Sequence, residues 1–318
     1  MVNAVGAVYW SDSTGLCRLF LAAFLVMCLG SVGSTDEAPK DARLAIVCST
    51  TQIADFARQV VGDDWDVRCV LAPGQDPHLY DTTPNDIRLV RQADLCLANG
   101  WHLEGNDWMR TLADNVDKPL VNCTDGVPPL MVDDEESKRP VRDPHAWFSP
   151  ENAAVYVRNI LLAVVQLDPE GEARYRARTE FYLRQLRSLD LWVKQQVSAI
   201  PRERRVLVTS HDAFAYFCDR YGFKAAAPEG WNTGEEIGGG ATYARRQQAV
   251  ESIRSFGVPA IFVETSVNPK LIRDIADEAG VEVGGELYSD SMGPAGTTAE
   301  HYLGMMRENV LMIVEALK

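Results

Sequence analysis

Short apolar runs alternate along the chain with longer segments in which apolar residues recur at helical spacing. Residues 44–47 form a fully apolar run of the kind that makes a buried strand. Thr51 can cap the helix that follows, whose apolar period continues to Val61. The same alternation predicts further elements in the first half: strands at 67–71, 95–98 and 120–122, a helix opened by Thr83 and Asn85, and a helix at 106–115.

The second half repeats this alternation. The pattern predicts strands at 205–209, 260–264 and 281–283, and helices at 213–221, 244–256, 269–279 and 300–317. Strands that alternate with helices form parallel sheets with right-handed crossovers, so we expect an α/β fold.

One longer helical segment separates the two halves. Pro169 suits the first turn of a helix, an apolar stripe then runs from Tyr175 to Ile200, and Pro201 ends it. About 30 helical residues span roughly 45 Å, which exceeds the width of a small domain. We therefore expect a single helix that joins the halves and limits hinge motion between them.

The amino terminus has the features of an export signal. An apolar run at 19–29 follows an arginine, and small residues continue to Ser34. The run is short for a membrane span, so we predict a signal peptide at 1–34, cleaved after Gly33 or Ser34. Two alternatives remain open, a lipoprotein signal acylated at Cys28 and an uncleaved membrane anchor. In each case the protein acts in the periplasm or another extracytoplasmic space.

Composition narrows the possible partners. A length of 318 residues with 46% hydrophobic residues suits about two packed domains. The net charge of −14 argues against binding to nucleic acid, which requires a basic face. An acidic surface favours encounters with cations instead.

The cysteines do not indicate a disulfide framework. Two of the seven lie in the predicted leader, and the other five are Cys48, Cys69, Cys96, Cys123 and Cys218. An odd number without close spacing argues against paired disulfides and against a thiolate zinc cluster. We expect these residues to fill the core, with one disulfide as the open alternative.

Two of the five histidines lie in matching Asp-Pro-His sequences, at His78 and His145. Proline fixes its own φ angle and restricts the residue before it, which makes each sequence a stiff corner. A stiff corner can hold an imidazole in one direction, as a metal ligand requires. His211 comes just after the apolar run Val206 to Val208. These residues predict a metal-binding protein.

His78, His145 and His211 each lie just after a predicted strand or in the loop that follows it. Ligands of open α/β sheets bind outside the carboxyl ends of the strands, so these imidazoles can converge if the halves face each other. A fourth ligand is then expected from the second half, where Asp290 occupies the corresponding position. Three other carboxylates compete for that role: Asp212, Glu264 and Glu286.

Three imidazoles and one carboxylate suit Zn²⁺ in four coordination, and also Mn²⁺ or Fe²⁺ if both carboxylate oxygens bind. The remaining histidines, His102 and His301, are expected to lie outside the site, with His301 at the start of the last helix and facing water.

These residues resemble the metal-binding solute receptors of ABC transporters, the TroA/ZnuA-type family, and TroA-type members most. The resemblance covers nearly everything after the leader. Its motifs are PGQDPH at 73–78, DPHAWF at 143–148, TSHDAF at 209–214, IFVE at 261–264 and GELYSDSMG at 285–293. It implies His78, His145, His211 and Asp290 as ligands. It also implies lobes at 42–167 and 202–318, each with a small parallel sheet flanked by helices, joined by a helix at 168–201.

The chain departs from the family pattern in two places. Zinc-selective relatives often carry a histidine-rich loop before the second motif, where this chain has acidic residues at 133–136. The loop at 231–242 also differs. Manganese-type relatives often place glutamate where His211 stands, so the histidine favours zinc.

The resemblance implies that the protein captures Zn²⁺, or Mn²⁺ or Fe²⁺, for an ABC transporter permease in the cytoplasmic membrane. We expect a monomer without enzymatic activity. Two other classes remain as alternatives, a zinc hydrolase and a surface adhesin. The hydrolase is disfavoured because four protein ligands leave no open position on zinc and no His-Glu-x-x-His sequence is present.

Overall fold

Four parallel strands in the order β2–β1–β3–β4 form the larger sheet. The computed structural model describes residues 43–133, 139–226, 243–266 and 269–318. The predicted leader, the acidic residues 134–136 and the loop at 231–242 lie outside the described residues. The strands are β1 (Ala45–Cys48), β2 (Asp66–Cys69), β3 (Leu95–Ala98) and β4 (Leu120–Asn122).

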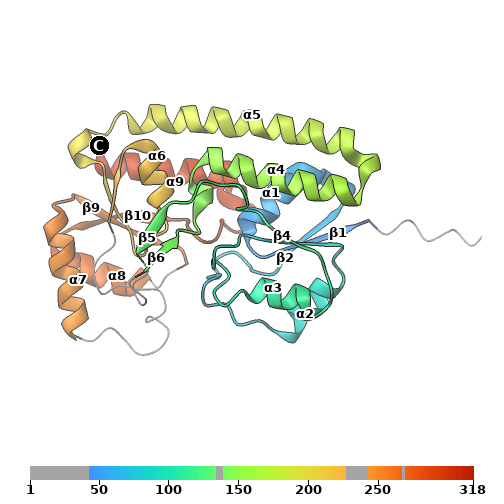
Figure 1. Cartoon of the computed structure of the whole chain (residues 1–318). Coiled ribbons are helices and arrows are strands. Elements are labelled where there is room, and N and C mark those ends of the chain that lie inside the picture. Colours follow the sequence, from blue (N-terminus) through green and yellow to red (C-terminus); the bar gives the residue numbers. More distant parts are fainter. Residues whose placement is uncertain (1–42, 134–138, 227–242, 267–268) are drawn as a thin grey trace, which may run out of the picture. The chain divides into compact units, whose positions relative to one another are not determined.

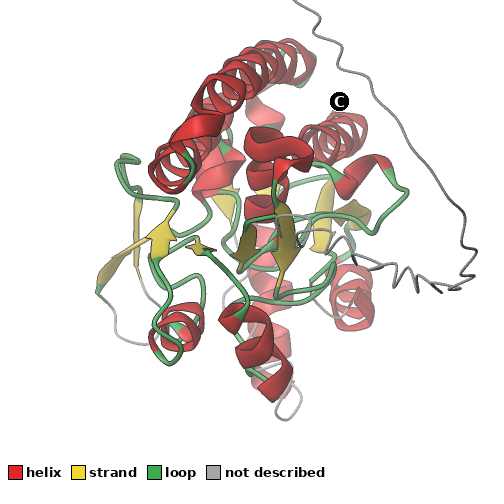
Figure 2. Cartoon of the chain, turned by 90° about the vertical axis from the view of Figure 1, so that its right-hand side faces the viewer, coloured by secondary structure: helices red, strands yellow, loops and turns green. Residues whose placement is uncertain are grey.

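Helices cover both faces of this sheet (Figure 2), which explains why its central strands β1 and β3 are fully buried apolar runs. Residues of β1 alternate between two hydrophobic clusters, with Ile46 in one and Val47 in the other. The helices of this half are α1 (Thr51–Val61), α2 (Pro84–Arg91) and α3 (Trp108–Asp114). Thr83 and Asp86 form a capping box at the start of α2, which fixes where the loop after β2 ends.

Two further elements precede the long helix and were not predicted from the sequence. An antiparallel hairpin pairs β5 (Met131–Asp133) with β6 (Pro140–Arg142) and flanks the acidic stretch. A short 3₁₀ turn at Ala146–Phe148 then leads into α4 (Pro150–Leu167), whose first turn is capped by Ser149. This helix packs against α1 and along the long helix.

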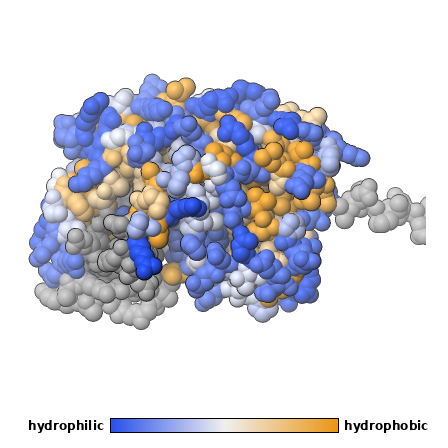
Figure 3. All heavy atoms as spheres, viewed as in Figure 1, coloured by the Kyte–Doolittle hydropathy of each residue, from blue (hydrophilic) through white to orange (hydrophobic). Residues whose placement is uncertain are grey.

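The long helix is α5 (Glu172–Val197), and it runs past both groups of strands (Figure 1). It is shorter than predicted, because Pro169–Gly171 form a separate 3₁₀ turn in which Asp168 accepts a hydrogen bond from the Gly171 amide. One face of α5 is buried, through the following residues: Tyr175, Thr179, Tyr182, Leu186, Leu189, Asp190, Val193 and Val197. Hydrophilic residues dominate the surface in the region of α5 (Figure 3), as expected for a helix with one face in water.

The second half contains two parallel pairs, β7 (Val206–Val208) with β8 (Lys224–Ala226), and β9 (Ala260–Glu264) with β10 (Glu282–Leu287). Its helices are α6 (Ala215–Tyr221), α7 (Tyr243–Phe256), α8 (Pro269–Ala279) and α9 (Tyr302–Leu317). The predicted α/β fold is confirmed: two lobes with parallel sheets flanked by helices are joined by one long helix. The lobe boundaries at 42–167 and 202–318 stay predictions.

One hydrophobic cluster extends through both lobes. It contains Phe56 of α1, Tyr182 of α5 and Phe217 of α6, among many others. The rings of Phe56 and Tyr302 lie 4.9 Å apart, so α1 and α9 meet directly. All five described cysteines are free, and four are buried, which agrees with their expected role in the core. Within the described ranges, no helix combines the length and apolar character needed to cross a membrane.

Candidate metal centre

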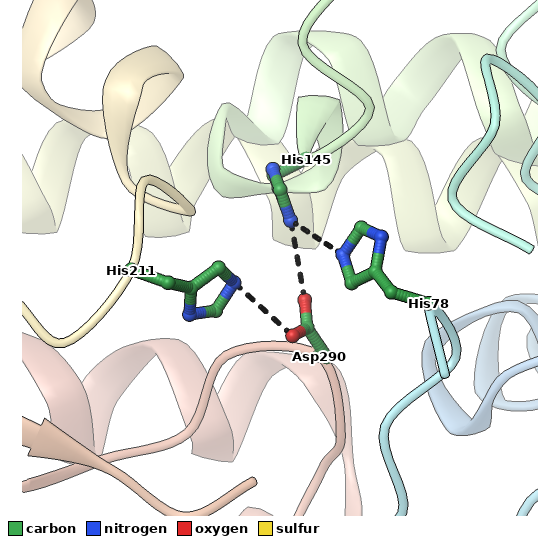
Figure 4. A group of neighbouring side chains, drawn as sticks. All are labelled: His78, His145, His211 and Asp290. Carbon is green, nitrogen blue, oxygen red and sulfur yellow. Dashed lines mark hydrogen bonds and ion pairs between the residues drawn. The ribbon is translucent and has the colours of Figure 1, made fainter. Parts of the chain in front are cut away.

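Four side chains from distant parts of the chain face one another at the junction of the lobes (Figure 4). They are His78, His145, His211 and Asp290, and each offers a ligand atom within 4.8 Å of all the others. The Nε2 atoms of His78 and His145 lie 3.2 Å apart. The two oxygens of Asp290 lie 3.3 Å from Nε2 of His145 and 3.2 Å from Nε2 of His211. No other group of this kind occurs among the described residues.

These side chains lie in loops that follow strands. His78 lies in the loop after β2, His211 follows β7, and Asp290 follows β10. His145 follows the hairpin strand β6 and immediately precedes the 3₁₀ turn that leads into α4. The sequence argument from the carboxyl ends of parallel strands therefore applies to three of the four positions.

A buried carboxylate orients His145 from behind. Asp143 Oδ1 accepts a hydrogen bond from the His145 backbone amide at 2.9 Å and lies 2.7 Å from Nδ1 of the ring. Asp143 is fully buried, so this contact has no competition from water. With Nδ1 held in this way, Nε2 is directed towards the other three side chains.

Glu264 supports His211 in the same manner. Its Oε1 accepts hydrogen bonds from the His211 amide at 2.9 Å and from the Ser210 hydroxyl at 3.1 Å. Its Oε2 lies 2.6 Å from Nδ1 of His211. Glu264 was one of the carboxylates expected to compete with Asp290, but it lies behind the histidine rather than in the cluster.

The other two competing carboxylates also lie outside the cluster. Glu286 forms an ion pair with Arg273 at 2.5 Å on the exposed surface. Asp212 is exposed and is not one of the four facing residues. Asp290 is thus the carboxylate that the structure brings together with the three histidines.

The matching Asp-Pro-His sequences differ in what their aspartates do. Asp76 Oδ1 accepts a hydrogen bond from the His78 amide at 2.8 Å, as Asp143 does for His145. Only Asp143 also contacts the ring nitrogen of its histidine. The shared motif therefore fixes both backbones but orients only one imidazole.

Comparison with known proteins agrees with this arrangement. Residues 46–316 match the model of the ZnuA family, described as the periplasmic component A of the zinc-uptake complex. The chain belongs to this family. A manganese-binding lipoprotein, MntA of Halalkalibacterium halodurans, is 31% identical over 95% of this chain and 98% of its own. The manganese ABC transporter substrate-binding lipoprotein PsaA of Streptococcus pneumoniae is 32% identical over 95% and 97%.

Solved structures of ZnuA-family proteins share the fold. The periplasmic zinc-binding protein TroA of Treponema pallidum superposes with a TM-score of 0.78 at 32% identity, covering 86% of this chain and 99% of that one. A manganese-bound periplasmic metal-binding protein from Candidatus Liberibacter asiaticus gives a TM-score of 0.74 at 28% identity, covering 86% and 100%.

The three histidines differ in the direction in which their surroundings shift the pKa. Burial lowers the pKa of His78 to about 4, which leaves its ring neutral. Burial would lower the pKa of His145 too, but the charges of Asp143 and Asp290 outweigh it and raise that pKa to about 9. The pKa of His211 is raised for the same reason by Glu264 and Asp290.

The pKa of Asp290 shifts in the opposite direction to those of His145 and His211. Burial would raise its pKa, but His211 and His145 outweigh burial and hold the pKa well below its usual range. Both oxygens are buried, and each faces an imidazole nitrogen. The carboxylate is therefore charged and has lone pairs available on both oxygens for a cation.

A second network holds the loops of the site, and the sequence argument missed it. Glu104 is buried and accepts hydrogen bonds from the Ser49 hydroxyl and the Asn99 amide, each at 2.7 Å. The side chain of Asn99 donates to the Pro144 carbonyl at 3.0 Å. The one feature of the sequence that points to this network is Asn99-Gly100, which ends the strand β3.

Gly105 lets the same loop approach His78. Its φ of +49° favours glycine, and a Cβ there would lie 2.3 Å from the His78 carbonyl oxygen. The remaining histidines stay apart from the cluster, as expected. The His102 side chain is 79% exposed, and His301 precedes α9, where its Nδ1 lies 3.2 Å from Asp55.

Proposed function

We propose that this protein captures a divalent metal ion outside the cytoplasmic membrane and delivers it to the permease of an ABC transporter. The observation that carries the proposal is the cluster of His78, His145, His211 and Asp290, in a chain that belongs to the ZnuA family. These four residues hold the ion as cargo. The protein is exported by its amino-terminal signal and acts as a monomer.

Zinc is the favoured cargo. Imidazole nitrogens suit Zn²⁺ better than Mn²⁺, and the general order of affinities for divalent ions also places zinc above manganese and iron. Three imidazoles and one oxygen complete the four-coordinate arrangement that zinc prefers.

Manganese is the alternative, and two observations support it. Relatives such as MntA and PsaA are named as manganese-binding. Both oxygens of Asp290 face the histidines, so the site can supply five donor atoms instead of four. Metal contents measured in protein purified without added metal, followed by competition between Zn²⁺ and Mn²⁺, decide between the two ions.

Capture and release need no chemistry on the ion. A catalytic zinc keeps one position open for water, whereas four protein ligands fill a tetrahedral site. We therefore expect no turnover of ester, peptide or phosphoester substrates. Hydrolysis that disappears in a His145→Ala variant would instead indicate a zinc hydrolase.

The ligand assignment is tested by competition titration. We expect His145→Ala to lower the metal affinity by orders of magnitude while the fold is retained by circular dichroism. His102→Ala is the matched control, because it removes an exposed histidine outside the cluster. Near-native affinity in the His145 variant contradicts the assignment.

A further inference from the structure

We infer that His145, His211 and Asp290 form a preformed half of the site, and that His78 is the gating ligand that closes behind the ion and leaves first on release. The inference rests on the proposed function and extends it, because it assigns different roles to the four ligands. It follows from the unequal support that the structure gives to them.

The two histidines of the preformed half are each held at both ends. Asp143 contacts the amide and the ring Nδ1 of His145, and Glu264 contacts the amide and Nδ1 of His211. Rotation of either ring would remove the ring nitrogen from a buried carboxylate, which is costly. Both rings therefore present Nε2 before any ion arrives.

The segment that carries Asp290 is fixed by α1. The Gln52 side chain donates to the Ser289 carbonyl at 2.9 Å, and the Met292 amide donates to the Thr51 hydroxyl at 2.9 Å. These bonds lie on either side of Asp290, whose side chain is 1% exposed. The carboxylate is consequently held beside the two supported histidines.

His78 lacks comparable support for its ring. Nε2 faces His145, and no described group pairs with Nδ1, which points away from the other three side chains in Figure 4. The bonds around it hold only its backbone: Asp76 accepts from its amide, and Trp108 donates to the preceding carbonyl at 2.9 Å.

The surroundings of His78 also differ. Residues 72–75 of its loop are exposed, and Leu79 beside it is 38% exposed. Rotation of the His78 ring breaks no hydrogen bond to a carboxylate. The ring lies at the exposed side of the cluster. An ion can therefore reach the three fixed ligands first, after which His78 completes the site.

Association and release rates separate these roles. Stopped-flow fluorescence measures Zn²⁺ association with the mature full chain, and transfer to a chelating dye measures release. We expect His78→Ala to speed release on the order of 100-fold while association stays within about threefold of wild type, because the capturing half is intact. His102→Ala serves as control and should change neither rate.

Asp143→Asn tests the preformed half without removing a ligand. We expect it to slow association about tenfold, since the His145 ring loses its orienting charge. The inference is wrong if His78→Ala slows association as much as it lowers affinity, or if Asp143→Asn leaves association unchanged. Failure of the wild-type chain to bind Zn²⁺ or Mn²⁺ would instead overturn the proposed function.

Discussion

Carboxylates play two distinct roles around the proposed site. Asp290 faces the three histidines with both oxygens, whereas Asp143 and Glu264 stand behind individual rings. A carboxylate behind an imidazole fixes the ring and makes its free nitrogen a better donor. Residue type alone does not distinguish these roles.

Substitution of Glu264 tests the supporting role. We expect Glu264→Gln to lower the Zn²⁺ affinity about 10- to 100-fold, because the amide keeps the size of the side chain but loses the charge beside Nδ1 of His211. Competition titration measures the change. Glu286→Gln is the matched control, since Glu286 pairs with Arg273 at the surface and should leave affinity unaltered.

The pKa shifts predict how affinity depends on pH. In the metal-free protein His145 keeps a proton up to about pH 9, whereas His78, with a pKa of about 4, is already neutral. Metal must displace the proton, so affinity should rise from pH 6 towards pH 9, by about tenfold per pH unit for each proton displaced. Titrations at constant ionic strength measure this slope, and a flat profile would contradict the protonation scheme.

The four residues that meet at the site could be named from the sequence. The residues that hold them in place could be named only in part. The stiff Asp-Pro-His corners and the positions after strands pointed to the four facing side chains. Glu264 was noticed as a carboxylate after a strand, yet nothing in one sequence says whether such a group faces the ion or lies behind a ligand. Glu104 had even less signal, because its partners Ser49 and Asn99 meet it only after the strands have paired.

At the scale of elements, α5 contributes to stability through one face. Leu186 is 1% exposed and belongs to the cluster that spans both lobes, while Leu191 on the same helix is 68% exposed. The same substitution at the two positions therefore separates packing from helix propensity.

We expect Leu186→Ala to lower the free energy of unfolding by about 2 to 5 kcal/mol, because it leaves a cavity in the core. Leu191→Ala should change it by less than about 0.5 kcal/mol. Urea denaturation followed by circular dichroism measures both variants. Equal losses at the two positions would show that α5 is not packed as described.

Elements with a clear period were predicted closely, and others were missed. The strands at 95–98, 120–122 and 260–264 and the helix at 269–279 have the predicted bounds. The helix that ends at Val61 starts one residue earlier than predicted, because Thr50 and not Thr51 is its N-cap residue. The helix α4 was missed although Ser149-Pro150 is a good start signal and its buried residues keep a helical period. The strand β8 and the hairpin strands, of three residues each, were also missed.

For the whole molecule, ion binding and folding are linked. An ion that binds only the folded chain stabilises it, by about 2.7 kcal/mol at a free concentration 100 times the dissociation constant. We expect the melting temperature to rise on adding Zn²⁺ and to return after chelation. The His145→Ala variant should show a much smaller rise in the same calorimetric experiment.

The hydrophobic cluster that runs through both lobes bears on how the chain can be divided. Phe56, Tyr182 and Phe217 belong to one cluster that both lobes share, although each lobe also has a smaller cluster of its own. Cutting the chain near residue 168 would expose the apolar surface that the shared cluster buries, so we expect each fragment to be less stable alone than within the whole chain. We therefore expect the two lobes to stabilise each other, because the cluster that they share is complete only when both are folded.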